Sequence, residues 1–148
     1  MKIQCINREL SAGQKAFHRM LSRFNPQHAV TVGKEYLVIA ISFVVGSPFY
    51  GDSALYEVVN DNDHLVSVPA SLFKIIDARC STFWMARDHG DGTLSLRPEE
   101  LYQDYFYDKL SDRDPATRQE FKRLVAKLQG EFDASNDDST GLGGKSVG

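Results

Sequence analysis

The sequence predicts an α+β domain. Its centre is a small, strongly bent antiparallel sheet or a small barrel, with one N-terminal helix and two C-terminal helices. Two observations predict this architecture. Between residues 30 and 97, runs of β-branched and aromatic residues alternate with turn residues at intervals of about 8–12 positions, which is typical of small barrels. On both sides of this region, apolar residues recur at the spacing of helices.

Length and composition set the outer limits. A chain of 148 residues fits a single domain, and 42% hydrophobic with 25% charged residues is ordinary for a globular protein. The net charge of −3 argues against a general nucleic-acid binder, which usually carries an excess of Lys and Arg. We expect one globular domain over 1–133. Residues 134–148 are rich in Asp, Ser, Asn and Gly, so we expect a flexible polar tail there.

The N-terminal part predicts a strand followed by a helix. Residues 2–7 alternate between polar and apolar side chains, as in a half-buried strand. Ser11 and Gln14 have the spacing of a capping box, and Asn25-Pro26 would end the helix that starts there. Four apolar residues form one face of this helix: Phe17, Met20, Leu21 and Phe24.

The middle of the chain predicts short strands joined by turns. We expect strands at 35–45, 54–59, 65–68, 73–77, 82–87 and 93–96. Turn residues fill the connections at 46–53, 60–63 and 89–92. Pro69 should end one strand and start a single helical turn.

The last third changes to helical spacing. We expect a helix over 98–110, with Pro98 in its first turn, and a second over 115–129, with Pro115 at its start. Gly130 would end the second helix, because glycine readily takes the left-handed conformation found just after helices. Five apolar residues line one face of the second helix: Phe121, Leu124, Val125, Leu128 and Phe132.

Motifs for catalysis and metal binding are weak. Gly51-Asp52-Ser53 lacks the base and the orienting acid that a nucleophilic serine needs. A calcium loop over 88–99 fails because Gly90 and Gly92 stand where oxygen ligands belong. Asp61 and Asp63 could hold a cation weakly, but an Asx-rich turn needs none. We therefore expect no enzyme, no cofactor and no bound metal.

The sequence also favours a cytoplasmic location. Residues 1–8 lack the apolar core of a secretory signal, and the longest apolar run, 36–45, is shorter than the roughly 20 residues that span a bilayer. Cys5 and Cys80 form no Cys-x-x-Cys motif, and a chain without a leader suggests a reducing compartment. We expect two free thiols and no membrane partner.

Charge on the predicted 98–110 helix is the most informative pattern. Glu100, Asp104 and Asp108 recur every four residues, and Tyr107 lies on the same side. Like charges at this spacing repel one another by a few tenths of a kcal/mol each. The pattern fits a solvated acidic face, or a docking surface for a basic protein with Tyr107 as its aromatic anchor.

A loop adds a second candidate contact. Tyr50 and Asp52 lie among the turn residues of 46–53 and look exposed, and aromatic residues are enriched at protein interfaces. The other possibility is that the aromatic side chain folds over the end of a sheet.

The first predicted helix carries the opposite charge. Lys15, Arg19 and Arg23 recur every four residues away from its apolar face. They could face solvent, pair with the acidic helix, or contact phosphates. Because no exposed aromatic residues lie between them, the nucleic-acid signal is weak.

Part of the chain resembles a known family. The matching segments are VGKEYLV at 32–38, LYEV at 55–58, PASLFKIID at 69–77 and FW at 83–84. Over about residues 30–87 the chain is similar to small SH3-like bacterial immunity proteins, which accompany polymorphic toxins, including those of contact-dependent inhibition. The resemblance implies an SH3-like barrel and a non-enzymatic protein that binds and blocks one toxin. It assigns no contact residues.

We therefore expect an immunity or antitoxin-type protein. Its cognate bacterial toxin domain, a nuclease in many such systems, would be bound through the acidic surface. The expected contacts are Glu100, Asp104, Tyr107 and Asp108, with Tyr50 and Asp52 from the loop. The alternative is a small RNA- or ribosome-associated domain that uses the basic face of the first helix. The sequence leaves open whether the protein forms oligomers.

Overall fold

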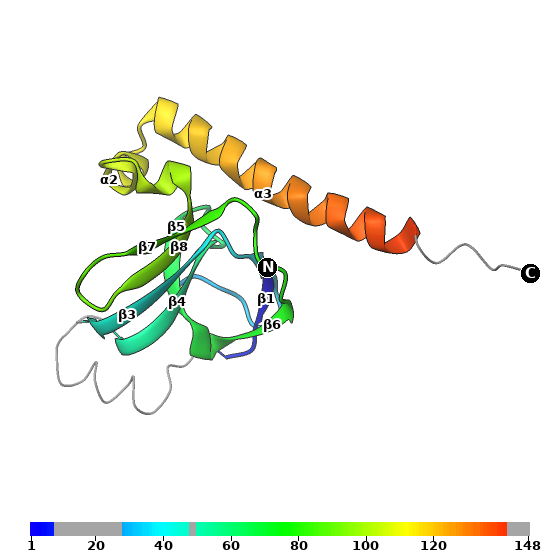
Figure 1. The fold of residues 1–148 in the computed structure, drawn as a ribbon, viewed down its shortest axis with the longest axis horizontal. Helices are drawn as coiled ribbons and strands as arrows, with labels where there is room; N and C mark the ends of the chain where they lie inside the picture. The colour runs from blue at the N-terminus through cyan, green and yellow to red at the C-terminus, as the bar shows by residue number, and fades with distance from the viewer. Residues whose placement is uncertain (8–27, 48–49, 142–148) are drawn as a thin grey trace, which may run out of the picture.

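Two antiparallel sheets dominate the structure (Figure 1), a computed structural model that describes residues 1–7, 28–47 and 50–141, with side chains described to residue 134. The three-stranded sheet has the order β2–β1–β6, and the five-stranded sheet has the order β5–β4–β3–β8–β7. The strands are β1 (Lys2–Cys5), β2 (Glu35–Leu37), β3 (Ala40–Ser47), β4 (Gly51–Val59), β5 (Leu65–Pro69), β6 (Phe73–Asp77), β7 (Trp84–Asp88) and β8 (Leu94–Pro98).

The predicted α+β class with three flanking helices is wrong. The described residues are mostly β, with one long helix, α3 (Pro115–Gly141). The other helical pieces are the short α2 (Phe106–Ser111) and the 3₁₀ turns η1 (Ala70–Leu72) and η2 (Glu99–Tyr102). The N-terminal helix predicted from Ser11 lies outside the described residues.

The predicted 98–110 helix is broken because its apolar residues do not share one face. Leu101 and Phe106 are only 2% and 3% exposed. Five residues apart on a continuous helix, they would point about 140° away from each other. The chain ends η2 at Tyr102 and starts α2 at Phe106, and Tyr105 between them has a left-handed φ of 62°. This break turns both side chains inward.

The predicted strand over 35–45 is also divided. β2 belongs to the small sheet and β3 to the large one, and Val38 and Ile39 form the corner between them. Both are 1% exposed, and they enter different cores. Since consecutive residues of a strand point to opposite faces, a corner between two packed layers buries both.

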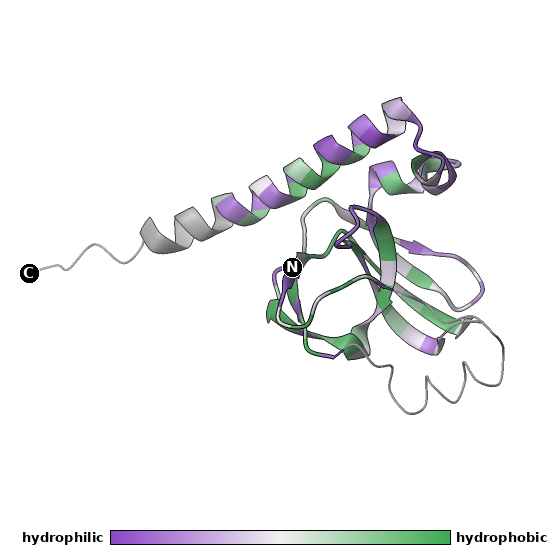
Figure 2. Cartoon of the chain, turned by 180° about the vertical axis from the view of Figure 1, so that it is seen from behind, coloured by the Kyte–Doolittle hydropathy of each residue, from purple (hydrophilic) through white to green (hydrophobic). Residues whose placement is uncertain are grey.

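Two hydrophobic cores hold the layers together. Figure 2 shows that hydrophobic residues are concentrated in the strands and recur at intervals along α3. The first lies between the two sheets and includes Ile3, Tyr36, Val58 and Phe73. The second lies between the outer face of the large sheet and the helices. It includes four of the residues named above: Leu101, Phe106, Phe121 and Leu124. Leu128 and the partly buried Val125 join the same core, so the predicted apolar face of the last helix is confirmed except at Phe132, which contacts Lys2 and Arg79 instead.

The last helix continues further than predicted. α3 passes through Gly130 and reaches Gly141, so its backbone includes the first part of the expected tail. The domain limit at residue 133 stays a prediction. In the part of the chain that the structure describes, no helix combines the length and the apolarity needed to cross a lipid bilayer.

Candidate partner-binding site

The η2–α2 corner lies on the outer face of the five-stranded sheet, and Tyr102 anchors it there. The Tyr102 hydroxyl donates to the Met85 carbonyl at 2.7 Å and lies 2.9 Å from the Ser95 hydroxyl. The guanidinium of Arg87 stands 4.5 Å from the centre of the Tyr102 ring, within the range of a cation–π contact. Contacts to β7 and β8 therefore fix the start of the corner.

A buried ion pair lies beneath the same corner. Arg97 Nε is 3.4 Å from Glu57 Oε2, and Glu57 is only 4% exposed. Burial raises the pKa of Glu57, while the neighbouring Arg97 and Tyr107 oppose this shift. Burial, together with the Glu57 charge, raises the pKa of Tyr107. The Tyr107 ring lies 5.3 Å from the guanidinium carbon of Arg97.

This burial changes the expected role of Tyr107. The sequence predicts it as an exposed anchor among carboxylates, but its hydroxyl is buried next to Glu57. The expectation of exposure is wrong because the break at Tyr105 alters the helical register on which it depended. In this conformation Tyr107 supports the corner from below, with its hydroxyl buried and its side chain only partly exposed.

Two of the predicted acidic residues remain on the surface. Asp104 and Asp108 are exposed, whereas Glu100 is partly buried. Glu100 Oε1 accepts a hydrogen bond from Lys127 Nζ at 2.8 Å. Burial of Glu100 raises its pKa, but Lys127 and the backbone outweigh this and leave the pKa below its ordinary value. Glu100 thus ties η2 to α3 while Asp104 and Asp108 face solvent.

The sequence analysis missed Tyr105, which lies between the two exposed carboxylates. It is 73% exposed and has a left-handed φ of 62°. Such backbone is uncommon for residues other than glycine, and strain of this kind is concentrated at functional sites. The five-residue spacing of Leu101 and Phe106 could have revealed it, because that spacing does not fit one helical face. We call Asp104, Tyr105 and Asp108 the acidic corner.

The predicted loop residues lie elsewhere. Tyr50 is buried, and its hydroxyl lies 2.6 Å from His28 Nε2. Burial raises the pKa of Tyr50 to about 12. The expected exposure of Tyr50 is therefore wrong, since its ring also stacks on His28.

Asp52 is exposed but does not join the acidic corner. Its Oδ1 accepts a hydrogen bond from the Gly46 amide at 2.8 Å and thereby closes the β3–β4 hairpin. The η2–α2 corner packs over Glu57, which follows Asp52 by five residues on β4. Five residues of extended strand span about 17 Å. Asp52 and the corner therefore form separate surfaces.

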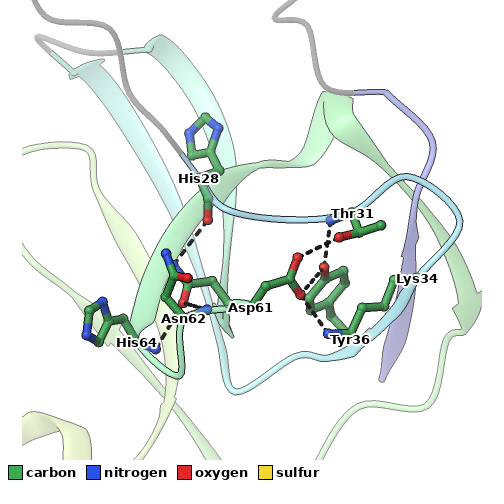
Figure 3. Close-up of polar contacts among 8 residues, drawn as sticks. His28, Thr31, Lys34, Tyr36, Asp61, Asn62 and His64 are labelled. Carbon is green, nitrogen blue, oxygen red and sulfur yellow. Dashed lines mark hydrogen bonds and ion pairs between the residues drawn. The ribbon is translucent and has the colours of Figure 1, made fainter.

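Asp61 is fully engaged by its own chain (Figure 3). One carboxylate oxygen accepts hydrogen bonds from Lys34 Nζ at 2.6 Å and the Tyr36 hydroxyl at 2.9 Å, and the other from Thr31 Oγ1 at 2.6 Å. The hydrogen bond from Lys34, followed by those from Thr31 and Tyr36, lowers the pKa of Asp61 to about 2. These partners occupy the oxygens that a cation at Asp61 and Asp63 would need. Among the side chains that the structure describes, which end at residue 134, no group of three His, Cys, Asp or Glu residues could hold a metal ion.

One serine contacts a histidine in an arrangement that superficially resembles a catalytic pair. His89 Nε2 lies 2.8 Å from Ser95 Oγ. Ser95 is 0% exposed, and its hydroxyl also contacts Tyr102. A nucleophile must be reached by its substrate, so this geometry fits a structural network under the corner.

The basic residues Lys15, Arg19 and Arg23 lie outside the described residues.

No family model, curated protein or solved structure matches the chain.

Proposed function

We propose that the chain is a non-enzymatic, cytoplasmic immunity protein that binds and neutralises one bacterial toxin domain through the acidic corner. The observation that carries the proposal is Tyr105, an aromatic side chain 73% exposed on strained backbone between two exposed carboxylates. Interfaces are enriched in tyrosine, and well-packed aromatic residues often dominate binding energy. The acidic corner offers this combination on a rigid support.

The charge of the corner favours a basic partner. Asp104 and Asp108 would attract a positively charged surface and accelerate association at low salt. Nuclease clefts are basic because they bind phosphates, so a nuclease toxin supplies matching charge. The resemblance of residues 30–87 to SH3-like immunity proteins supports the same class of partner.

Growth and copurification test the proposal. The toxin candidate is the C-terminal domain encoded by the adjacent reading frame, expressed alone and together with this protein. We expect toxicity that co-expression relieves, and a one-to-one complex. Failure of co-expression to protect would overturn the immunity proposal. Salt-sensitive RNA binding by the chain would then favour the RNA-associated alternative.

Charge reversal locates the contact surface. At low salt, D104K/D108K should bind the toxin more weakly than the parent protein does. At high salt the two affinities should become similar, since salt screens surface charges. The control E35K/D133K reverses two exposed carboxylates elsewhere and produces the same net charge. If both variants bind equally well, the acidic corner is not the contact.

A further inference from the structure

A groove separates the β4–β5 turn from the α2–α3 corner, on the side of α2 that the acidic corner does not use. Its volume is about 720 Å³, within the range of about 300–1,000 Å³ that holds small ligands in proteins. Leu65, Leu110, Phe121 and Val125 line its apolar part. Since α2 and α3 lie over the five-stranded sheet (Figure 1), strand and helix residues form opposite walls.

Both walls are held by hydrogen bonds. Asn60 Oδ1 accepts from the amides of Asn62 and His64, each at 3.0 Å, which fixes the β4–β5 turn. On the other wall, Asp114 Oδ2 accepts from the Thr117 amide at 2.9 Å and the Thr117 hydroxyl at 2.6 Å. The groove is therefore preformed, which reduces the entropy that binding a ligand costs.

The charged residues of the groove are mainly cations. Arg113, Arg118 and Lys122 line it, against a single carboxylate from Asp63, and His64 is the remaining titratable side chain on the strand wall. Within the described part of the chain, none of the three cations forms an ion pair. Asp114, the nearest acid before α3, is occupied by its hydrogen bonds to Thr117.

The arrangement of these cations is unfavourable for the protein alone. Arg118 and Lys122 are four residues apart on α3, where like charges repel each other. Arg118 also lies near the positive N-terminal end of the helix dipole. Arg113 has a left-handed φ of 61°, which an arginine rarely adopts. A bound anion would relieve the charge repulsion.

We propose that this groove binds a small organic anion with an apolar body. The anionic group would lie against Arg113, Arg118 and Lys122, and the apolar body against the leucines, Phe121 and Val125. Arginine presents paired donors that match carboxylates, sulfonates and phosphates. This site is distinct from the acidic corner and does not depend on the proposed function.

Fluorescent probes test both parts of the site. The first probe, 1-anilinonaphthalene-8-sulfonate, has an aromatic body and a sulfonate, and N-phenyl-1-naphthylamine is its uncharged counterpart. We expect R118Q/K122Q to bind the sulfonate about tenfold more weakly, because charge-assisted hydrogen bonds are lost. Binding of the uncharged probe should not change. Glutamine keeps a similar helix propensity, so α3 should stay intact.

The control K74Q/R123Q removes two exposed cations that do not line the groove. It should bind both probes like the parent protein. Decanoate should displace the sulfonate probe, and decan-1-ol should do so more weakly. Equal sulfonate affinity in the two double variants, or no binding by the parent, would overturn the proposal.

Discussion

Arg97 on β8 reaches across β3 to Glu57 on β4, with Nε 3.4 Å from the carboxylate oxygen Oε2. The same guanidinium group donates a hydrogen bond from Nη2 to the Ser42 hydroxyl on β3 at 3.2 Å. Three neighbouring strands are thus joined on the sheet face that carries the acidic corner. The rings of Tyr102 and Tyr107 cover the guanidinium group. The ion pair therefore couples the sheet to the corner above it.

Removing Arg97 should be strongly destabilising. The R97M variant leaves Glu57 buried without its ion-pair partner, and breaking a buried pair in this way costs about 3 kcal/mol or more. Urea unfolding should show this loss at pH 7. Because burial already raises the pKa of Glu57, R97M should regain stability as the pH falls and the carboxylate takes up a proton.

The double variant E57L/R97M provides the control for that interpretation. Replacing both partners with apolar residues removes the uncompensated charge, so the double variant should be more stable than R97M. If R97M unfolds at the parent urea concentration, or if the double variant is less stable than R97M, the ion pair does not couple the sheet to the corner.

Asp61 should make stability depend on acid pH. Its hydrogen bonds from Lys34, Thr31 and Tyr36 lower its pKa from 3.8 to about 2. A carboxylate with a lowered pKa stabilises the folded state above its unfolded pKa, and this contribution is lost as the pH falls from about 4 to about 2. The D61N variant should be less stable than the parent at pH 7 and should lose less stability over that interval.

Melting temperatures between pH 7 and pH 2 measure this difference. D63N is the matched control, because Asp63 lies in the same turn and is exposed, and no hydrogen bond to its carboxylate is seen in the described residues. It should retain the parent pH dependence. If D61N and D63N have the same acid dependence, the hydrogen bonds to Asp61 do not contribute as proposed.

Tyr105 should show a conflict between stability and binding. Glycine adopts a left-handed φ without steric cost, whereas other L-residues pay about 1–2 kcal/mol. Y105G should therefore unfold at the same or a higher urea concentration and bind the toxin more weakly. Y105A keeps the strain and loses the ring, so it should bind weakly without a gain in stability. Retention of full affinity by both variants would exclude Tyr105 as the anchor.

Residue type and spacing along the sequence predicted many strands of the two sheets. The strand at 73–77 and the helical turn before it are confirmed, because Pro69 and the run of β-branched residues specify them locally. The fold class was nevertheless wrong. Val38 and Ile39 look like the middle of one strand, and only the packing of two layers makes them a corner.

The candidate site was predicted only in part. The positions of Asp104 and Asp108 on the surface follow from their charge, which does not tolerate burial without a partner. The exposure of Tyr105 and the burial of the Tyr107 hydroxyl cannot be predicted in this way, since both depend on the left-handed backbone of Tyr105. Helical spacing assumes a constant turn per residue, so one break reassigns every residue beyond it.

Substitution of Gly130 tests the continuity of α3, because a glycine inside a helix and a glycine that ends one respond to alanine in opposite ways. In the structure, Gly130 lies inside α3, is exposed, and has open space where a Cβ atom would lie. G130A should therefore stabilise the protein by about 0.5–1 kcal/mol, since alanine is the better helix former. If the helix instead ended at Gly130 with left-handed backbone, as its sequence suggests, alanine would be strained there and G130A would destabilise the protein.

G33A is the matched control, because Gly33 has a φ of 89° in a turn and its substitution should be destabilising. Urea unfolding of the two variants distinguishes the interpretations, and a less stable G130A would contradict the continuous helix.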